Sequence, residues 1–302
     1  MVSENITIKC PDGISLCATV FSPENPPLAS VVFASALGVP RQFYRAFAAY
    51  LADNGIAALT FDYRGVGDSF PANGDVSRLQ MADWGKLDIN AVLAEAGARF
   101  KTSPLFLLGH SCGGQLFGLA PHSKQLAGVI LVSAQLANWR LWPLPSKLGM
   151  LLLWHVLIPV LCTGRTIFPA RKLGLSSVDV PSSIVAQWAR WARQPQYLFA
   201  GKFDLNRQHY NELSCPVLAY TFDDDGYAPL TAAEALLARL PNAIIDLEKV
   251  RASELNLGKI GHFGYFKEKA GNALWPRTLA WLYKIAGENK APTNSNRVNK
   301  TL

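Results

Sequence analysis

The chain has 302 residues, half of them hydrophobic and 17% charged, with a formal net charge of +7. This length and apolar content suffice for a large buried core, either one α/β domain with an insertion or two domains. Residues 1–9 are polar and alternating, so we expect no secretory signal at the start. The longest apolar run, 148–162, is about 15 residues, whereas a membrane span needs ~20. It predicts a buried or interfacial helix.

The cysteines argue against a disulfide framework and against structural zinc, because they are odd in number and form no C-x-x-C pair. They are Cys10, Cys17, Cys112, Cys162 and Cys215. No H-E-x-x-H metal motif is present either. We therefore expect no metal and no cofactor, and a reducing cytoplasm as the location.

The positive charge is concentrated in one segment. Residues 139–209 hold nine basic and two acidic side chains, a surplus equal to the whole formal net charge, and five of the eight tryptophans. Such a segment suits nucleic acid, an anionic membrane surface or an anionic amphipathic ligand. No basic-helix or RNP-like pattern supports nucleic acid, so we expect no nucleic-acid partner. We do expect peripheral contact with an anionic membrane surface.

The first part of the chain predicts a hairpin followed by alternating strands and helices. Residues 6–9 and 15–21 alternate around the turn Pro11-Asp12-Gly13, which predicts an antiparallel hairpin. From residue 56 onward the alternation of strand and helix predicts right-handed crossovers and a parallel sheet. The expected strands are 30–34, 56–61, 104–108 and 128–133, and the expected helices are 43–54, 81–99 and 114–120.

The alternation of strands and helices is interrupted between residues 139 and 205. The segment is apolar, basic and interrupted by prolines, with helical pattern at 147–161 and 182–192. The core pattern returns afterwards as strands 216–222 and 243–250 and helices 230–240 and 274–286. We therefore predict a helical cap at 139–205, inserted between two parts of one α/β core, 1–138 and 206–288. The polar tail, 289–302, is predicted to be disordered.

The stretch Gly109-His110-Ser111-Cys112-Gly113 fits the pattern G-x-S-x-G. It stands between the predicted strand 104–108 and the predicted helix 114–120. A serine on such a tight turn has its hydroxyl lifted clear of the backbone, and small neighbours let the strand and helix pack closely. Ser111 is therefore the candidate nucleophile.

A serine hydroxyl needs a base, and the base needs an orienting acid. His262 suits the base because it lies in the loop Gly261-His262-Phe263-Gly264, whose glycines allow close backbone approach; His155, in the apolar run of the cap, is the alternative. The acid is expected where strand 216–222 ends, since α/β sheets place function there. Asp225 is the candidate, with its neighbour Asp224 as the alternative.

The order Ser111, Asp225, His262 is that of α/β-hydrolases, and the chain resembles that superfamily over about residues 5–288. The turn at 62–69, D-Y-R-G-V-G-D-S, adds to the resemblance. It implies the α/β-hydrolase fold: a mostly parallel twisted sheet with an antiparallel N-terminal hairpin, helices on both faces and an inserted helical cap. More narrowly, the chain is similar to a group of uncharacterised bacterial α/β-hydrolases, which implies no substrate.

Two backbone N–H groups are expected to form the oxyanion hole. One belongs to Cys112, directly after the nucleophile. Many relatives carry His-Gly after the third strand, where this chain has Ala34-Ser35-Ala36-Leu37-Gly38. The second donor is therefore predicted to be Ala36 or Leu37.

The leading functional prediction is a serine hydrolase that cleaves a carboxylic ester or thioester through an acyl-enzyme. The substrate is expected to be a small or lipid-like molecule with an apolar acyl chain of medium or greater length and an anionic group, because tryptophans supply flat apolar area and arginines suit carboxylates or phosphates. The alternatives are an acyltransferase on the same scaffold and a non-catalytic binding protein with a vestigial triad. The substrate-binding candidates are Trp142, Trp154, Trp188 and Trp191.

Overall fold

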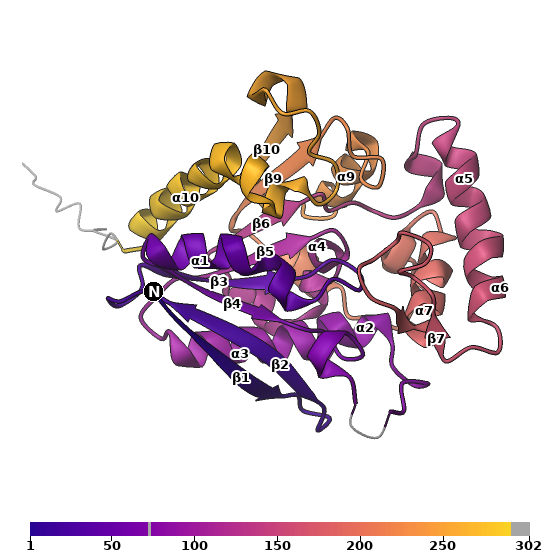
Figure 1. Ribbon diagram of the computed structural model, residues 1–302, viewed down its shortest axis with the longest axis horizontal. Helices are drawn as coiled ribbons and strands as arrows, with labels where there is room; N and C mark the ends of the chain where they lie inside the picture. Colours follow the sequence, from indigo (N-terminus) through magenta and orange to yellow (C-terminus); the bar gives the residue numbers. More distant parts are fainter. Residues whose placement is uncertain (72–73, 291–302) are drawn as a thin grey trace, which may run out of the picture.

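An eight-stranded sheet forms the centre of the protein, shown in Figure 1 as a computed structural model that describes residues 1–71 and 74–290. The spatial order is β1-β2-β4-β3-β5-β6-β9-β10. Only β2 runs against the others, since it pairs antiparallel with β1 and β4 while all other pairs are parallel. The strands are β1 (Val2–Lys9), β2 (Ser15–Ser22), β3 (Ala29–Ala34), β4 (Ile56–Phe61), β5 (Leu105–His110), β6 (Gly128–Val132), β9 (Pro216–Phe222) and β10 (Ile244–Val250).

Helices cover both faces of this sheet (Figure 1). On one face α1 (Arg45–Asp53) and α10 (Glu268–Lys290) contact each other and form one apolar core with alternate residues of the central strands. On the other face α3 (Asn90–Arg99) packs on the intervening strand residues. The remaining helices of the core are α2 (Met81–Asp83), α4 (Cys112–Leu116), α8 (Gln208–Glu212) and α9 (Leu230–Leu237).

The central strands are buried at every position, whereas the edge strands are not. In β3, β4, β5 and β6 no residue is even half exposed, but β1 and β10 are largely open to solvent. Parallel strands between two helical layers need apolar residues on both faces. This is why these four strands are continuous apolar runs. The predicted fold class is confirmed.

Residues 139–205 form a helical layer beside the carboxyl ends of the strands, at the right of Figure 1. A single continuous helix runs through α5 (Ser146–Leu152), the π-helical turn η7 (Leu153–Leu157) and α6 (Ile158–Cys162); we call it the cap helix. It contacts α7 (Ser182–Ala192). A small ribbon, β7 (Ile167–Phe168) with β8 (Val180–Pro181), was not predicted because two residues are too few to show alternation.

Some element boundaries differ from the prediction. The helix expected at 81–99 includes a π-helical stretch, η3 (Trp84–Ile89), and the helix after Ser111 continues beyond α4 as the 3-10 turn η4 (Phe117–Leu119). The last helix begins six residues before the predicted 274 and contains Pro276 in its interior. It extends through Lys290, whereas the rest of the predicted tail, 291–302, lies outside the described residues. Across the described ranges, no helix has the length and apolar character to span a membrane.

Candidate active site

Ser111 lies on a sharp turn between β5 and α4. Its backbone has φ 52° and ψ −118°, a conformation that side-chain-bearing residues adopt only where packing enforces it. The packing is tight here. A Cβ on Gly113 would lie 2.1 Å from the carbonyl oxygen of Ala34, and one on Gly109 would lie 2.5 Å from the Cα of Gly114. The glycines are therefore required for the strand, turn and helix to approach closely enough to present the serine.

His262 and Asp225 form a buried pair beside this turn. His262 Nδ1 lies 2.8 Å from Asp225 Oδ2 and 3.1 Å from Oδ1. An ionised carboxylate only accepts hydrogen bonds, so Nδ1 carries the proton and Nε2 is the basic nitrogen. His262 and Ser111 line the same cavity. Within residues 1–71 and 74–290 the Ser111 hydroxyl makes no hydrogen bond, and catalytic hydrogen bonds often tighten only when substrate binds.

The carboxylate of Asp225 is held in its ionised form. Burial raises its pKa, but the hydrogen bond and charge of His262 and the N–H of Tyr227 outweigh burial, so that the net pKa is lowered. Oδ1 accepts hydrogen bonds from the amides of Tyr227 at 2.9 Å and Ala228 at 3.1 Å. These amides fix the carboxylate, which in turn can fix the imidazole tautomer.

The carboxylate of Asp224, the alternative acid, contacts the backbone of the histidine loop and not the imidazole. Its two carboxylate oxygens accept hydrogen bonds from the amides of Ile260 and Gly261, both at 2.8 Å. Asp223 accepts the amide of Ala252 at 3.3 Å. Each of the three adjacent carboxylates therefore has its own partner, and only Asp225 reaches the imidazole.

A buried hydrogen-bond chain joins the turn at Ser111 to the histidine loop and to the loop after β3. His110 Nε2 lies 2.8 Å from the carbonyl oxygen of His262, and His110 Nδ1 lies 2.9 Å from the hydroxyl of Tyr44. Since a carbonyl only accepts, Nε2 donates and Nδ1 accepts the Tyr44 proton. The amide of Ala36 donates to the same hydroxyl at 2.9 Å. Burial, together with the charge of His262, lowers the pKa of His110 to about 3.

The prediction of Ala36 as an oxyanion donor is wrong in this structure, because its N–H is engaged by Tyr44. The amides of Leu37 and Cys112 make no hydrogen bond to any other group of the described chain, and Leu37 lines the cavity beside Ser111. The Cys112 thiol is buried, which raises its pKa, and contacts the carbonyl oxygen of Ser35 at 3.6 Å. Its side chain is therefore a packed group and not a second nucleophile.

The turn at 62–69 braces the loop that follows β3. The buried carboxylate of Asp62 accepts the Arg41 amide at 2.6 Å and pairs with the Arg41 guanidinium. Arg64, in the same turn, pairs with the buried Asp88 at 2.7 Å. None of these residues lines the cavity, so the motif stabilises the scaffold and does not contact the site.

The cavity that contains Ser111 is small, mostly apolar and partly open to solvent. Its volume open to the centre of a water molecule is about 50 Å³. No Lys, Arg, Asp or Glu of the described chain lines it. The lining residues are Ala36, Leu37, Ser111, Gln135, Ala137, Trp142, Met150, Leu153, Trp154, Ile158, Phe168, Leu175, Val185, Trp188, Tyr227, His262 and Phe263.

The four candidate tryptophans divide into two groups. Trp142, Trp154 and Trp188 line the cavity. Trp191, about one helical turn beyond Trp188 on α7, is absent from the lining and instead packs within the cap against Tyr197. Trp154 is buried, and its indole N–H has no hydrogen-bond partner among the described residues. His155, the alternative base, is exposed on the cap helix.

A buried polar network that the sequence did not predict adjoins the cavity. The indole N–H of Trp188 donates to the hydroxyl of Tyr197, which donates to Gln115 Oε1, both at 2.5 Å. Gln115 Nε2 donates to Gln135 Oε1 at 3.1 Å, and Gln135 Nε2 donates to the carbonyl oxygen of Tyr227. These residues are scattered over the sequence and carry no local motif, so no sequence signal could have grouped them.

Comparisons with known proteins agree with this architecture. Residues 25–173, just under half of the chain, match the family described as serine aminopeptidase, S33. No curated protein matches the chain significantly. Among solved structures, a soluble variant of monoglyceride lipase from Saccharomyces cerevisiae in complex with a substrate analog is 17% identical, with a TM-score of 0.70 over 94% of this chain and 96% of that one.

Two esterases are similar in the same way. A carboxyl esterase from Bacillus coagulans is 13% identical, with a TM-score of 0.63 over 95% of this chain and 99% of that chain. A thermophilic esterase from Thermogutta terrifontis is 17% identical, with a TM-score of 0.58 over 94% and 99%. Such low identities speak for the fold. Taken with the sheet order and the sharp turn at Ser111, they show that the chain has the α/β-hydrolase fold.

Proposed function

We propose that the protein is a serine hydrolase of carboxylic esters with neutral, apolar acyl groups. The observation that carries the proposal is that His262, whose Nδ1 lies 2.8 Å from Asp225, lines the same cavity as Ser111. A neutral imidazole with its proton fixed on Nδ1 is the base that a serine nucleophile needs.

In the proposed reaction Ser111 Oγ attacks the ester carbonyl carbon while His262 Nε2 takes the hydroxyl proton. The negative charge moves to the carbonyl oxygen, where the amides of Cys112 and Leu37 donate to it. The C–O bond to the alcohol then breaks, and His262 gives its proton to the leaving oxygen. Water attacks the resulting acyl-enzyme in the same way, with His262 as base, and releases the acid and free Ser111.

The cavity lining argues for an uncharged acyl group. Leu153, Trp154 and Ile158 present only apolar or aromatic surface, and no basic residue of the described cap reaches the cavity. The anionic group expected from the sequence therefore has no partner there, and it is not part of the proposal. About 50 Å³ is room for only a few water-sized groups. Short acyl chains fit as the structure stands, whereas longer chains require side chains of the cap helix to move.

The same lining argues against an aminopeptidase. Such an enzyme binds the positively charged amino terminus of its substrate, and a buried cation needs a carboxylate or several acceptors. The described lining holds no Asp or Glu, and the Oε1 of Gln135 already accepts a hydrogen bond from Gln115. An ester substrate makes no such demand.

Two measurements test the proposal. Purified protein is treated with a fluorophosphonate probe and, separately, assayed on p-nitrophenyl acetate, butyrate, hexanoate and decanoate, with an aminoacyl p-nitroanilide as the peptidase control. We expect labelling that Ser111→Ala abolishes, activity highest on the short esters, and none on the anilide. Labelling without ester turnover, or turnover that survives Ser111→Ala, contradicts the proposal. A product ester formed on adding a primary alcohol at the expense of free acid would instead indicate an acyltransferase.

A further inference from the structure

The outer face of the cap helix carries large apolar side chains that nothing in the described structure covers. Leu144, Leu148, Leu152, Val156 and Val160 are between 49% and 72% exposed. Their spacing of four residues places them along one side of the helix and the turn before it. We call these five residues the outer stripe. In Figure 1, α5 and α6 form the right-hand edge of the molecule, with no other element beyond them.

The outer stripe is not required for the fold. The opposite side of the same helix supplies Met150, Leu153, Trp154 and Ile158 to the cavity wall, so the packing of the helix onto the protein is already complete. Single exposed leucines are common on protein surfaces, but a contiguous apolar patch usually marks an interaction site.

A groove rich in arginine adjoins the outer stripe at α6. It has a volume of about 680 Å³ and is lined by Arg78, Arg190 and Arg193, together with Pro159 and Thr163 of the cap helix and its end. Within residues 1–71 and 74–290 none of these three guanidinium groups forms an ion pair, although Arg78 acts electrostatically on Asp75.

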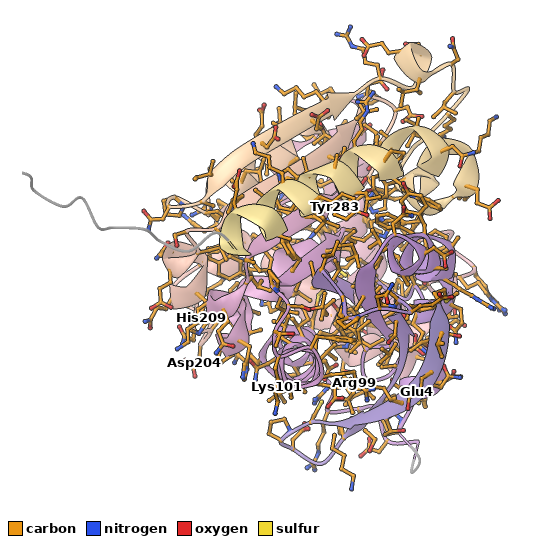
Figure 2. The ribbon with its side chains drawn as sticks, turned by 90° about the vertical axis from the view of Figure 1, so that its left-hand side faces the viewer. Glu4, Arg99, Lys101, Asp204, His209 and Tyr283 are labelled. Atoms are coloured by element: carbon orange, nitrogen blue, oxygen red, sulfur yellow. The ribbon has the colours of Figure 1, made fainter. Side chains whose placement is uncertain are left out.

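The far face of the molecule is different, as Figure 2 shows. There acidic and basic side chains are interspersed, and Arg99 pairs with Glu4 at 3.1 Å.

We propose that the outer stripe and the arginine groove together dock the cap onto an anionic lipid bilayer. The cap helix lies in the plane of the interface, its outer stripe enters the headgroup–acyl boundary, and the groove takes an anionic headgroup. Apolar burial and attraction of basic residues to anionic lipid are the two terms that hold such helices at a membrane.

The charges favour a bilayer over a second copy of this chain. A symmetric dimer brings the same patch of both subunits together, and here that would oppose Arg190 and Arg193 to their own copies. Nor does the helix span the membrane, since Trp154 and Ile158 are packed into the protein and no helix of the described residues is long and apolar enough.

The experiment is vesicle flotation of the intact protein with phosphatidylcholine alone and with phosphatidylcholine mixed with phosphatidylglycerol. Two variants remove the two terms separately: Leu152→Glu with Val156→Glu, and Arg190→Glu with Arg193→Glu. Their matched controls introduce the same changes away from the cap: Val2→Glu with Leu28→Glu, two exposed apolar positions, and Lys101→Glu with Lys284→Glu, two exposed basic ones.

We expect the wild-type protein to float with the mixed vesicles and much less with phosphatidylcholine alone. Each cap variant should lose roughly tenfold or more in binding. The arginine variant replaces two cations that attract anionic lipid with two anions, and the outer-stripe variant replaces apolar side chains that enter the bilayer with charges that the anionic surface repels. The control variants should keep binding. Absence of binding to the mixed vesicles, or equal losses in cap and control variants, overturns the proposal. So does a dimer in sedimentation that the outer-stripe variant converts to monomer without changing lipid binding.

Activity on p-nitrophenyl butyrate, measured without vesicles, keeps this inference separate from the proposed function. None of the substituted residues lines the cavity, so all variants should hydrolyse the soluble ester like the wild type. Vesicle binding without esterase activity would contradict the proposed function and support the docking surface. Esterase activity without vesicle binding would support the proposed function and contradict the docking surface.

Discussion

The central strands and the cap helix are both continuous apolar runs, yet their surroundings differ. Every residue of β3 through β6 is covered by helices on two sides, whereas the cap helix has the cavity on one side and no described neighbour on the other. In the sheet, apolar residues stabilise the fold. In the cap, they line the cavity on one side of the helix and stay exposed on the other.

The two regions also divide the proposed chemistry. The reacting groups, Ser111, Asp225 and His262, all follow strands of the core, while more than half of the cavity wall comes from the cap. Changes in the core should therefore affect every substrate alike, and changes in the cap should affect only the choice among substrates.

The largest effect is expected for Ser111→Ala. Turnover of every ester should fall by roughly 10⁴-fold or more, as losses of a catalytic serine do. The melting temperature should barely change, because the hydroxyl makes no hydrogen bond within the described residues. Steady-state kinetics and thermal denaturation on one preparation measure both. A variant that still turns over any ester at the wild-type rate would show that Ser111 is not the nucleophile.

Asp225→Asn should cost almost as much, on the order of 10⁴-fold in kcat, because the amide no longer fixes the imidazole tautomer. Asp224→Asn is the matched control one residue away. It weakens the hydrogen bonds to Ile260 and Gly261, so we expect a lower melting temperature and only a modest loss of kcat. Comparable kcat losses in the two variants would mean that the carboxylates act together on the loop and that neither is the specific partner of His262.

Tyr44→Phe should lower kcat by about tenfold with KM nearly unchanged, since it removes the hydrogen bonds that tie the Ala36 loop to His110. Tyr265→Phe is the control. It deletes another buried hydroxyl, bonded to Thr278 at 2.6 Å, in the same apolar core. We expect a similar loss of stability from both and a loss of kcat only from Tyr44→Phe; equal kinetics in the two would make Tyr44 purely structural.

His110 makes stability depend on pH. Its pKa is about 3 in the folded chain, against ~6.5 unfolded, so the unfolded state binds the extra proton between these values. The contribution of His110 to the free energy of unfolding is therefore fully present above pH ~6.5. It decreases as the pH falls, by up to ~1.4 kcal/mol per pH unit. Urea denaturation between about pH 4 and 7 should show a shallower slope for His110→Gln than for the wild type. Parallel slopes would assign the dependence to other groups.

The smallest effect is expected in the cap. Trp154 lines the cavity, and Trp154→Phe removes part of its ring together with a buried, unpartnered N–H. The value of kcat/KM for hexanoate relative to acetate should therefore rise about threefold. Trp191→Phe, in the same cap but away from the cavity, should leave that ratio unchanged. If both shift the ratio, the cap acts through its overall packing and not through its wall.

The features that the sequence predicted are local ones. The strand pattern follows from apolar runs, the position of Ser111 follows from five consecutive residues, and the histidine loop is marked by its own glycines. Each depends on the chemistry of neighbouring residues along the chain, which is why the elements, the fold class and the candidate nucleophile could be written down from the sequence.

The tertiary structure alone decided which of these groups meet. It placed Asp225 and not Asp224 at the imidazole, engaged the Ala36 amide with Tyr44, and kept Trp191 out of the cavity that Trp154 lines. Adjacent or equally spaced residues of the same type have the same local pattern. What separates them is the direction in which each side chain or amide points once distant segments have packed, and that direction is set by long-range contacts that no stretch of neighbouring residues encodes.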